Sequence, residues 1–249
     1  MIKMMAAICR RPGMTHAEYA AYVQHVHGAI ATEHPAGLRR YVQNHVFDAA
    51  FGGGDDHAHS LVPARDSVTE LYWDSPKDMA DTFAHEHVRT RVGPDGANFS
   101  DLDVALSLVA LEVEQPVRQP ARGAGAKVMH FMRAAQDLAL PEFVERWASA
   151  HDRALSAAPA AAEAIRRCVH SRQIPEFNKM LAYFGGSDVF YEGVGSLWFD
   201  DVSSIGAFRA YERALLEINA DPKRAFYQPS RSFFLYTTEI PIFQQGKQP

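Results

Sequence analysis

The chain has 249 residues, of which 47% are hydrophobic and 22% are charged, and its formal net charge at pH 7 is −5. This balance is typical of a soluble globular protein with apolar residues for one large or two ordinary domains. The lack of a basic surplus argues against nucleic acid as a partner. The sequence contains no run of about 18 apolar residues, which argues against a membrane span.

The chain contains two cysteines, Cys9 and Cys168. A disulfide framework in a chain of this size needs more of them, so we expect two small buried thiols and a cytoplasmic protein. The N-terminus combines a charge with a short apolar run, but Arg10-Arg11-Pro12 interrupts that run. We therefore interpret residues 2–9 as a first strand and not as a signal peptide.

The first half predicts the order strand, helix, strand, strand, helix, strand. Thr15 and Glu18 form a capping-box pattern at the start of the first helix, whose apolar side ends at His27. Ser75 followed by Pro76 predicts the start of the second helix. The predicted helices and strands are strand 2–9, helix 15–34, strand 38–47, strand 68–73, helix 75–89 and a strand within 101–114.

The second half repeats this series. Lys127 and His151 each stand 124 residues after Lys3 and His27, and residues 116–126 have the Pro- and Gly-rich composition of a linker. The pattern predicts a tandem repeat with domains at 1–115 and 127–249. Two βαββαβ units predict an α+β fold of two tandem ferredoxin-like domains, whose exposed sheet faces would pack together. This packing would occur within one chain or between two copies.

The first half resembles the EthD family of the dimeric α+β barrel superfamily. The resemblance rests on RRPGMTHAEYAAYVQHVHG, LRRYVQNHV and TELYWDSPKDM, and it covers residues 1 to about 115. The second half is similar through its helix, His151 and SLWFDD, but it lacks the Gly after His and the YVQN run. The resemblance implies a dimeric or pseudo-dimeric α+β barrel with a ligand cavity between sheet and helices. It also implies a chemistry found in such barrels, which includes cofactor-free cyclases, isomerases, lyases and monooxygenases.

His27 and His151 are the first catalytic candidates because imidazole titrates near neutral pH and transfers protons without a cofactor. The alternative for each is a histidine that caps a helix end. On the predicted second strand, Tyr41 and Gln43 share one face and Asn44 takes the other. Tyr41 is a third catalytic candidate, because a phenol in the cavity would stabilise an enolate. The predicted substrate-binding residues are Gln43, Asn44, His130, Tyr22, Trp147, Phe184 and Arg172.

Three His-x-His pairs invite a metal interpretation. The pairs at 25–27 and 85–87 lie on predicted helices, where residues two apart point away from each other. The pair at 57–59 lies in a polar loop without a third ligand at a fixed spacing. We therefore predict neither a metal nor a cofactor.

The sequence predicts a cofactor-independent lyase or isomerase that uses histidine acid–base catalysis on a small hydrophobic, oxygenated, aromatic substrate. The alternatives are a binding or accessory protein without chemistry, a cofactor-free monooxygenase and a haem-binding barrel. For assembly, we expect a homodimer, or a monomer with an intramolecular pseudo-dimeric barrel.

Overall fold

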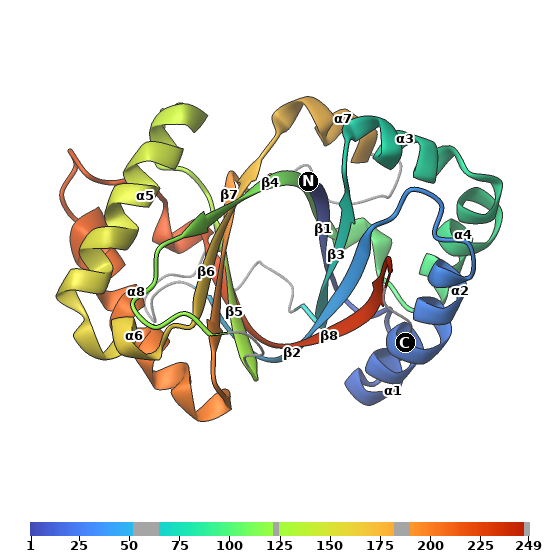
Figure 1. The fold of residues 1–249 in the computed structure, drawn as a ribbon, viewed down its shortest axis with the longest axis horizontal. Helices are drawn as coiled ribbons and strands as arrows, with labels where there is room; N and C mark the ends of the chain where they lie inside the picture. The colour runs from blue at the N-terminus through green and yellow to red at the C-terminus, as the bar shows by residue number, and fades with distance from the viewer. Residues whose placement is uncertain (52–64, 122–124, 182–189, 247–249) are drawn as a thin grey trace.

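In the described part of the chain, eight strands form one closed antiparallel barrel, with helices on two opposite sides (Figure 1). The computed structural model describes residues 1–51, 65–121, 125–181 and 190–246. The strands are β1 (Ile2–Ile8), β2 (Arg40–Phe51), β3 (Ser67–Trp73), β4 (Leu106–Gln115), β5 (Ala126–Met132), β6 (Arg167–Gln173), β7 (Gly193–Phe199) and β8 (Phe233–Gln244). Their order around the barrel is β1-β3-β2-β8-β5-β7-β6-β4, and β4 pairs with β1 to close it.

The helices cover the outside of the barrel in two groups. The first group is α1 (His16–Ala21), α2 (Gly28–Glu33), α3 (Pro76–Ala84) and α4 (Gly93–Asp95), with π-helical turns η1 (Tyr22–His27) and η3 (Val88–Val92). The second group is α5 (Leu140–Ala157), α6 (Pro159–Ala164) and α8 (Ile205–Asn219), and the short α7 (Asn178–Leu181) lies near β4. Figure 1 shows the two groups on opposite sides of the barrel.

The prediction of two ferredoxin-like domains in a dimeric-type α+β barrel is wrong. Two separate sheets would leave β2, β4, β6 and β8 as edge strands, with unpaired backbone groups. In the structure β2 pairs with β8 and β4 pairs with β6, so all eight strands belong to one closed barrel. Closure removes the exposed edges, which explains why it replaces two packed sheets. The domain boundaries at 115 and 127 stay a prediction.

Side chains alternate between the barrel interior and the two helix-covered faces, as the period of a strand requires. The interior holds an apolar cluster that includes Met5, Val68, Leu108, Met129 and Phe131. The face under α5, α6 and α8 is filled by a large cluster that contains Phe143, Trp147, Phe208 and Phe226. The face under α1 to α4 is packed less completely, and it contains the cavity described below.

Several local predictions are confirmed. Thr15 and Glu18 form the capping box of α1, and the Ser75 side chain caps α3 with Pro76 in its first turn. The first predicted helix is a continuous run from His16 to Glu33, but its centre has π-helical and not α-helical hydrogen bonds. Within the described residues, none of the helices combines the length and the apolar character that a membrane crossing requires.

Candidate functional site

A cavity of about 510 Å³ lies between the outer face of the barrel and the first group of helices. This volume lies in the range of ligand pockets, which hold small molecules of drug size. Its walls are mostly apolar, and the polar groups are few. The apolar lining includes Met4, Ala6, Ile8, Leu38, Leu71, Trp73, Phe83, Val88, Val92, Phe99 and Leu102.

His27 lines this cavity and forms a hydrogen-bonded pair with Asp95. The distance from His27 Nδ1 to Asp95 Oδ2 is 2.8 Å, and the His27 ring packs against Phe99 at 4.7 Å between centroids. Because a carboxylate accepts, Nδ1 carries the proton and donates it to Asp95. The lone pair is then on Nε2, which has no hydrogen-bond partner among the described residues.

Asp95 is held by two further donors. The Tyr22 hydroxyl and the Asn98 amide both donate to its Oδ1 atom, at 2.7 Å and 2.9 Å. Burial alone would raise the pKa of the Asp95 carboxyl, but the hydrogen bonds from Asn98, Tyr22 and His27 lower it. Asp95 therefore stays ionised and keeps His27 in a fixed tautomer and orientation.

Burial lowers the pKa of His27, while Asp95 opposes that shift by stabilising the imidazolium. The side chain of His27 is 16% exposed and that of Asp95 is 8% exposed. His27 is therefore neutral near pH 7, with a basic nitrogen available for a ligand. A neutral histidine with an aspartate behind it is suited to act as a general base.

The backbone around His27 is unusual because η1 contains π-helical hydrogen bonds. The Gly28 N–H donates to the Val23 carbonyl oxygen, five residues earlier. The Gln43 side chain on β2 donates to the same carbonyl at 2.8 Å, so the barrel wall holds this turn in place. Short π-helical segments are frequent at functional sites, and this one sets the direction of the His27 side chain.

The predicted residues of β2 do not line this cavity. The Tyr41 hydroxyl and the Val23 carbonyl both accept hydrogen bonds from Gln43, and burial raises the pKa of Tyr41 to about 12. Asn44 points to the opposite face, where its amide donates to Glu70 and to the Val68 carbonyl. In the structure these polar groups bind protein atoms.

The predicted residues of the second half lie in a different environment. His151 and Trp147 lie on the buried face of α5, and Trp147 stacks on His170. His130 does not pair with His151 among the described contacts; its ring packs edge-on against Tyr227, Phe234 and Phe208. Arg172 on β6 is partly buried. Phe184 and the pair at 57–59 lie outside the described residues.

The haem alternative does not fit His151. His151 is fully buried, and its two ring nitrogens lie 2.8 Å from the Tyr211 hydroxyl and 3.0 Å from the Pro116 carbonyl oxygen, so a flat haem ring does not fit beside either of them. The space around it is filled by the aromatic residues of the large core cluster. The second half therefore offers no room for a macrocycle beside this histidine.

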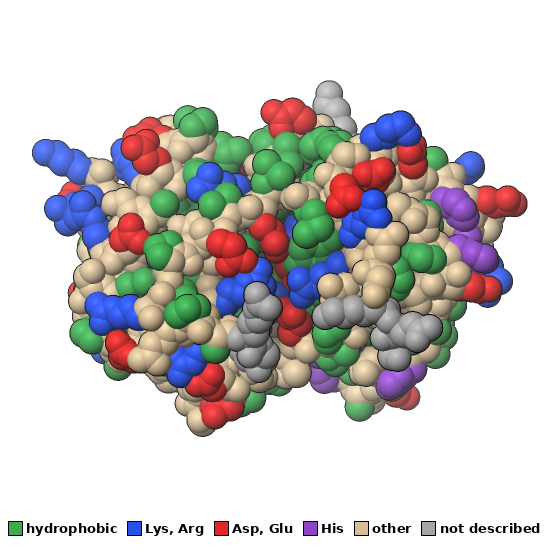
Figure 2. Space-filling view, viewed as in Figure 1, with side chains coloured by type: hydrophobic (Ala, Val, Ile, Leu, Met, Phe, Trp, Pro, Cys, Tyr) green, Lys and Arg blue, Asp and Glu red, His purple; other side chains and the backbone are tan. Residues whose placement is uncertain are grey.

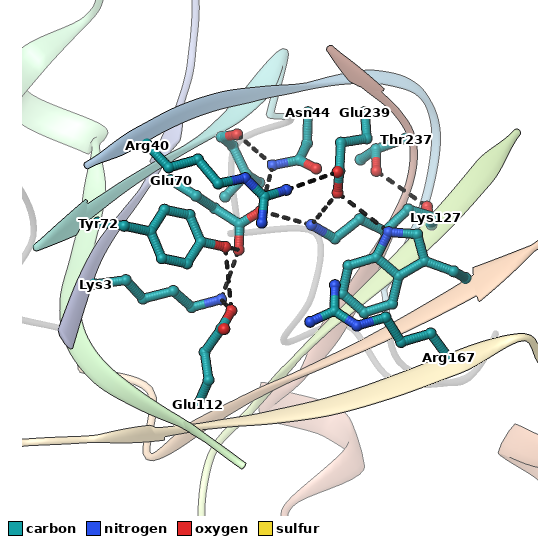
Figure 3. Close-up of polar contacts among 12 residues, drawn as sticks. Lys3, Arg40, Asn44, Glu70, Tyr72, Glu112, Lys127, Arg167, Thr237 and Glu239 are labelled. Carbon is teal, nitrogen blue, oxygen red and sulfur yellow. Dashed lines mark hydrogen bonds and ion pairs between the residues drawn. The ribbon is translucent and has the colours of Figure 1, made fainter. Parts of the chain in front are cut away.

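A charged cluster lies inside the barrel, where Glu70 binds two lysines at 2.6 Å each (Figure 3). We call it the barrel ion network, and it consists of Lys3, Glu70, Glu112, Lys127 and Glu239. Its members come from both halves of the chain. Figure 2 shows acidic and basic side chains gathered around the hollow at the centre of one face, over the barrel. Every charge in the network has an opposite partner, as the interior of a protein requires.

Two important groups, Asp95 and the barrel ion network, were missed from the sequence. Asp95 lies 68 residues from His27 in the segment Gly93-Pro94-Asp95-Gly96, which reads as a turn. The available signal for the network was a lysine or glutamate within each of several apolar strands, at Lys3, Glu70 and Lys127. A charge in a buried strand requires a partner, and that requirement could have drawn attention to them.

Comparisons with known proteins identify a family match in the first half of the chain. A family model described as the EthD domain matches residues 11–103, the part that carries His27 and Asp95. A search of curated proteins gives no match.

Solved structures similar to the chain include an anthrone oxidase-like protein, with 10% identity, a TM-score of 0.54, and coverage of 100% of this chain and 96% of that one. A candidate monooxygenase from Fusobacterium nucleatum has 8% identity, a TM-score of 0.54 and coverage of 99% and 95%. A mutant chlorite dismutase from Candidatus Nitrospira defluvii has 11% identity, a TM-score of 0.53 and coverage of 97% and 92%. These identities support a shared fold and no more.

Proposed function

We propose that the protein is a cofactor-independent enzyme that removes a proton from a small hydrophobic, oxygenated substrate, with His27 as the general base. One observation carries this proposal. The His27 ring lines an apolar cavity of about 510 Å³, and its Nδ1 atom is bound to the buried carboxylate of Asp95. This arrangement leaves Nε2 as the basic nitrogen of a ring that lines the cavity.

The opposite wall offers two hydroxyl groups for a developing negative charge. Thr69 on β3 and Ser107 on β4 both pair with Ala6 of β1, so they flank a small side chain on the cavity wall. Hydroxyl donors in an apolar site stabilise an enolate oxygen strongly because water does not compete. These two residues replace Tyr41, Gln43 and Asn44 as the proposed oxyanion donors.

The proposed reaction takes a proton from carbon next to a carbonyl group. Nε2 of His27 accepts the proton, and the electron pair of the C–H bond moves to the carbonyl oxygen as an enolate. The His27 imidazolium then returns the proton to another carbon, which gives an isomerase, or the enolate expels a leaving group, which gives a lyase. The similarity to an anthrone oxidase-like protein and to a monooxygenase favours a third course, in which molecular oxygen adds to the enolate carbon. One oxygen atom then stays on that carbon as a new carbonyl, and the other leaves as water.

Proton abstraction can be measured before the full reaction is known. We would incubate the protein in D₂O with a panel of cyclic aromatic ketones, beginning with anthrone, and follow deuterium incorporation by mass spectrometry. His27→Gln and Asp95→Asn should lower the exchange rate by about 100-fold or more. The matched control is His25→Gln, an exposed histidine on the same π-helical turn, which should keep the wild-type rate.

Three further readouts separate the alternatives. Oxygen consumption with exchange would support a monooxygenase, and exchange without it a lyase or isomerase. Tight ligand binding without exchange would support a binding protein, and a Soret band in purified protein would support the haem alternative. Exchange that His27→Gln and Asp95→Asn both leave unchanged would refute His27 as the base.

A further inference from the structure

Three potential metal ligands lie together between α5 and β6. They are on the side of the barrel that the second group of helices covers, whereas the His27 cavity lies under the first group. They are His151 on α5 and Cys168 and His170 on β6, and all three are buried. Residues two apart on a strand face the same side, so Cys168 and His170 both point toward α5. One ligand atom from each of the three lies within 4.8 Å of the others.

His151 is oriented with a lone pair toward this cluster. Its Nε2 atom lies 3.0 Å from the Pro116 carbonyl oxygen, which can only accept, so Nε2 carries the proton. Its Nδ1 atom is then an acceptor, 2.8 Å from the Tyr211 hydroxyl and 3.8 Å from the Cys168 sulfur. A backbone carbonyl that fixes the second ring nitrogen is the usual support of a histidine metal ligand.

His170 is held rigidly and has an unsatisfied nitrogen. Its ring stacks on Trp147 at 3.6 Å between centroids with planes 10° apart, and it meets His151 edge-on at 5.5 Å. Gly193 allows this packing, because a Cβ atom there would lie 2.6 Å from the Trp147 ring. The His170 Nδ1 atom is buried and has no hydrogen-bond partner in the described part of the chain. A buried polar atom without a partner indicates a missing ligand or ion.

Two imidazoles and one thiolate form a ligand set for zinc and not for calcium or magnesium, which prefer oxygen. The Tyr211 hydroxyl lies 2.8 Å from Nδ1 of His151 and places an oxygen beside the cluster. A surface hollow of about 690 Å³ is lined by Pro116, the residue that holds His151.

We propose that His151, Cys168 and His170 bind one Zn²⁺ ion that joins α5 to β6, with the Tyr211 hydroxyl oxygen as the fourth ligand. On binding, the Cys168 S–H bond breaks, the sulfur forms a bond to zinc, and one proton leaves to solvent. Tyr211 keeps its proton and releases Nδ1 to the metal. The site is structural, because all four ligands come from the protein.

Cobalt provides a spectroscopic probe of the ligands. We would add one equivalent of Co²⁺ to the metal-free full chain and record the visible and near-ultraviolet spectra. We expect 1:1 binding with a thiolate-to-cobalt charge-transfer band. Cys168→Ser should lose the band, and Cys9→Ser, which removes the other cysteine, should keep it. His170→Gln should weaken Co²⁺ binding by at least about 10-fold.

X-ray absorption at the zinc edge of the wild-type protein does not depend on any variant folding. One sulfur at about 2.3 Å together with nitrogen or oxygen ligands at about 2.0 Å is the expected first shell. A shell without sulfur, a charge-transfer band that persists in Cys168→Ser, or no 1:1 binding at all would overturn the proposal. Circular dichroism of Cys168→Ser verifies that its result concerns the ligand and not the fold.

Discussion

At the scale of single residues, Asp95 decides what His27 can do. An isolated histidine on an apolar wall could lose its proton from either nitrogen. The carboxylate at 2.8 Å selects the tautomer with the proton on Nδ1, and it stabilises the imidazolium that forms when Nε2 accepts a proton. The two residues therefore act as one base.

Asp95→Asn should change the pH profile of the reaction in a defined direction. A base is active when it is neutral, so activity falls as pH drops through the pKa of His27, which burial places below its ordinary value of 6.5. Asp95 raises that pKa, so the asparagine variant should shift the acid limb of kcat/KM to still lower pH. Its plateau should fall at least about 100-fold because the amide does not enforce the reactive tautomer.

Tyr22→Phe provides a graded comparison. It removes one of the three donors to Asp95 but leaves the carboxylate and His27 in place. We expect a plateau loss of less than about 10-fold, in line with the loss of one hydrogen bond.

An acid limb that moves to higher pH in Asp95→Asn would contradict the proposed direction of the coupling.

Residue roles were only partly predictable from the sequence. His27 was identified because it ends an apolar helix stripe, which is local information. Asp95 and Cys168 gave no local signal, since their roles depend on partners 68 and 17 residues away. Asn44 was assigned to the correct strand face by alternation, but which face borders a cavity depends on the tertiary fold.

At the scale of elements, β5 places a neutral histidine among aromatic rings. His130 is 4% exposed, and burial lowers its pKa to about 4. The unfolded chain binds a proton at this position near pH 6.5, but the folded chain does so only near pH 4. Above pH 6.5 both states are neutral at this position and the free energy of unfolding is not reduced. As pH falls from 6.5 toward 4, the unfolded chain binds the proton and the folded chain does not, so the free energy of unfolding decreases.

His130→Leu should therefore flatten the pH dependence of stability. Between pH 7 and pH 4, His130 accounts for a loss of about 3 kcal/mol in the free energy of unfolding. Urea unfolding of wild type and variant at several pH values would give the difference. The exposed His25→Leu variant serves as the control and should follow the wild-type curve. Parallel curves for wild type and His130→Leu would refute the burial argument.

The elements themselves were the most predictable part of the molecule. The capping box at Thr15 and the Ser75 cap each depend on residues within three positions, and both are confirmed. The π-helical turn at η1 was not predicted, because the Gln43 side chain that holds it in place lies on β2. Apolar spacing does not distinguish the two helix types over six residues.

At the scale of the whole molecule, strand closure was beyond the reach of the sequence. Each half shows the alternation of a sheet, but alternation does not say which edge strands meet. One of the pairings that close the barrel joins Tyr41 to Phe243, near opposite ends of the chain. Glu70 of the first half likewise binds a buried lysine from each half, Lys3 and Lys127. Long-range strand pairing leaves no local sequence signal, and a charged residue in an apolar strand does not identify its partner, so two separate sandwiches were predicted in error.

The shared network makes the two halves depend on each other. If they separated, Glu70 would lose Lys127 and keep only Lys3, while β2 and β4 would expose their edges. Removing one partner from a buried ion pair costs roughly 3–5 kcal/mol. We therefore expect that a protease site inserted after Ala121 and then cut would leave the two fragments associated. They should elute together at the intact mass and unfold in urea in a single transition.

Lys127→Met tests the cause of that association. The variant keeps the β2–β8 and β4–β6 pairings, but it leaves Glu70 with one lysine and Glu239 with Arg40 and the Trp198 indole N–H. After cleavage, its fragments should separate at a lower urea concentration than those of the cleaved wild-type protein. The exposed pair of Lys77 and Asp81 offers a matched control, because Lys77→Met removes a lysine that water already screens. Two independent unfolding transitions in the cleaved wild-type protein would mean that the halves fold alone and that barrel closure adds little to their stability.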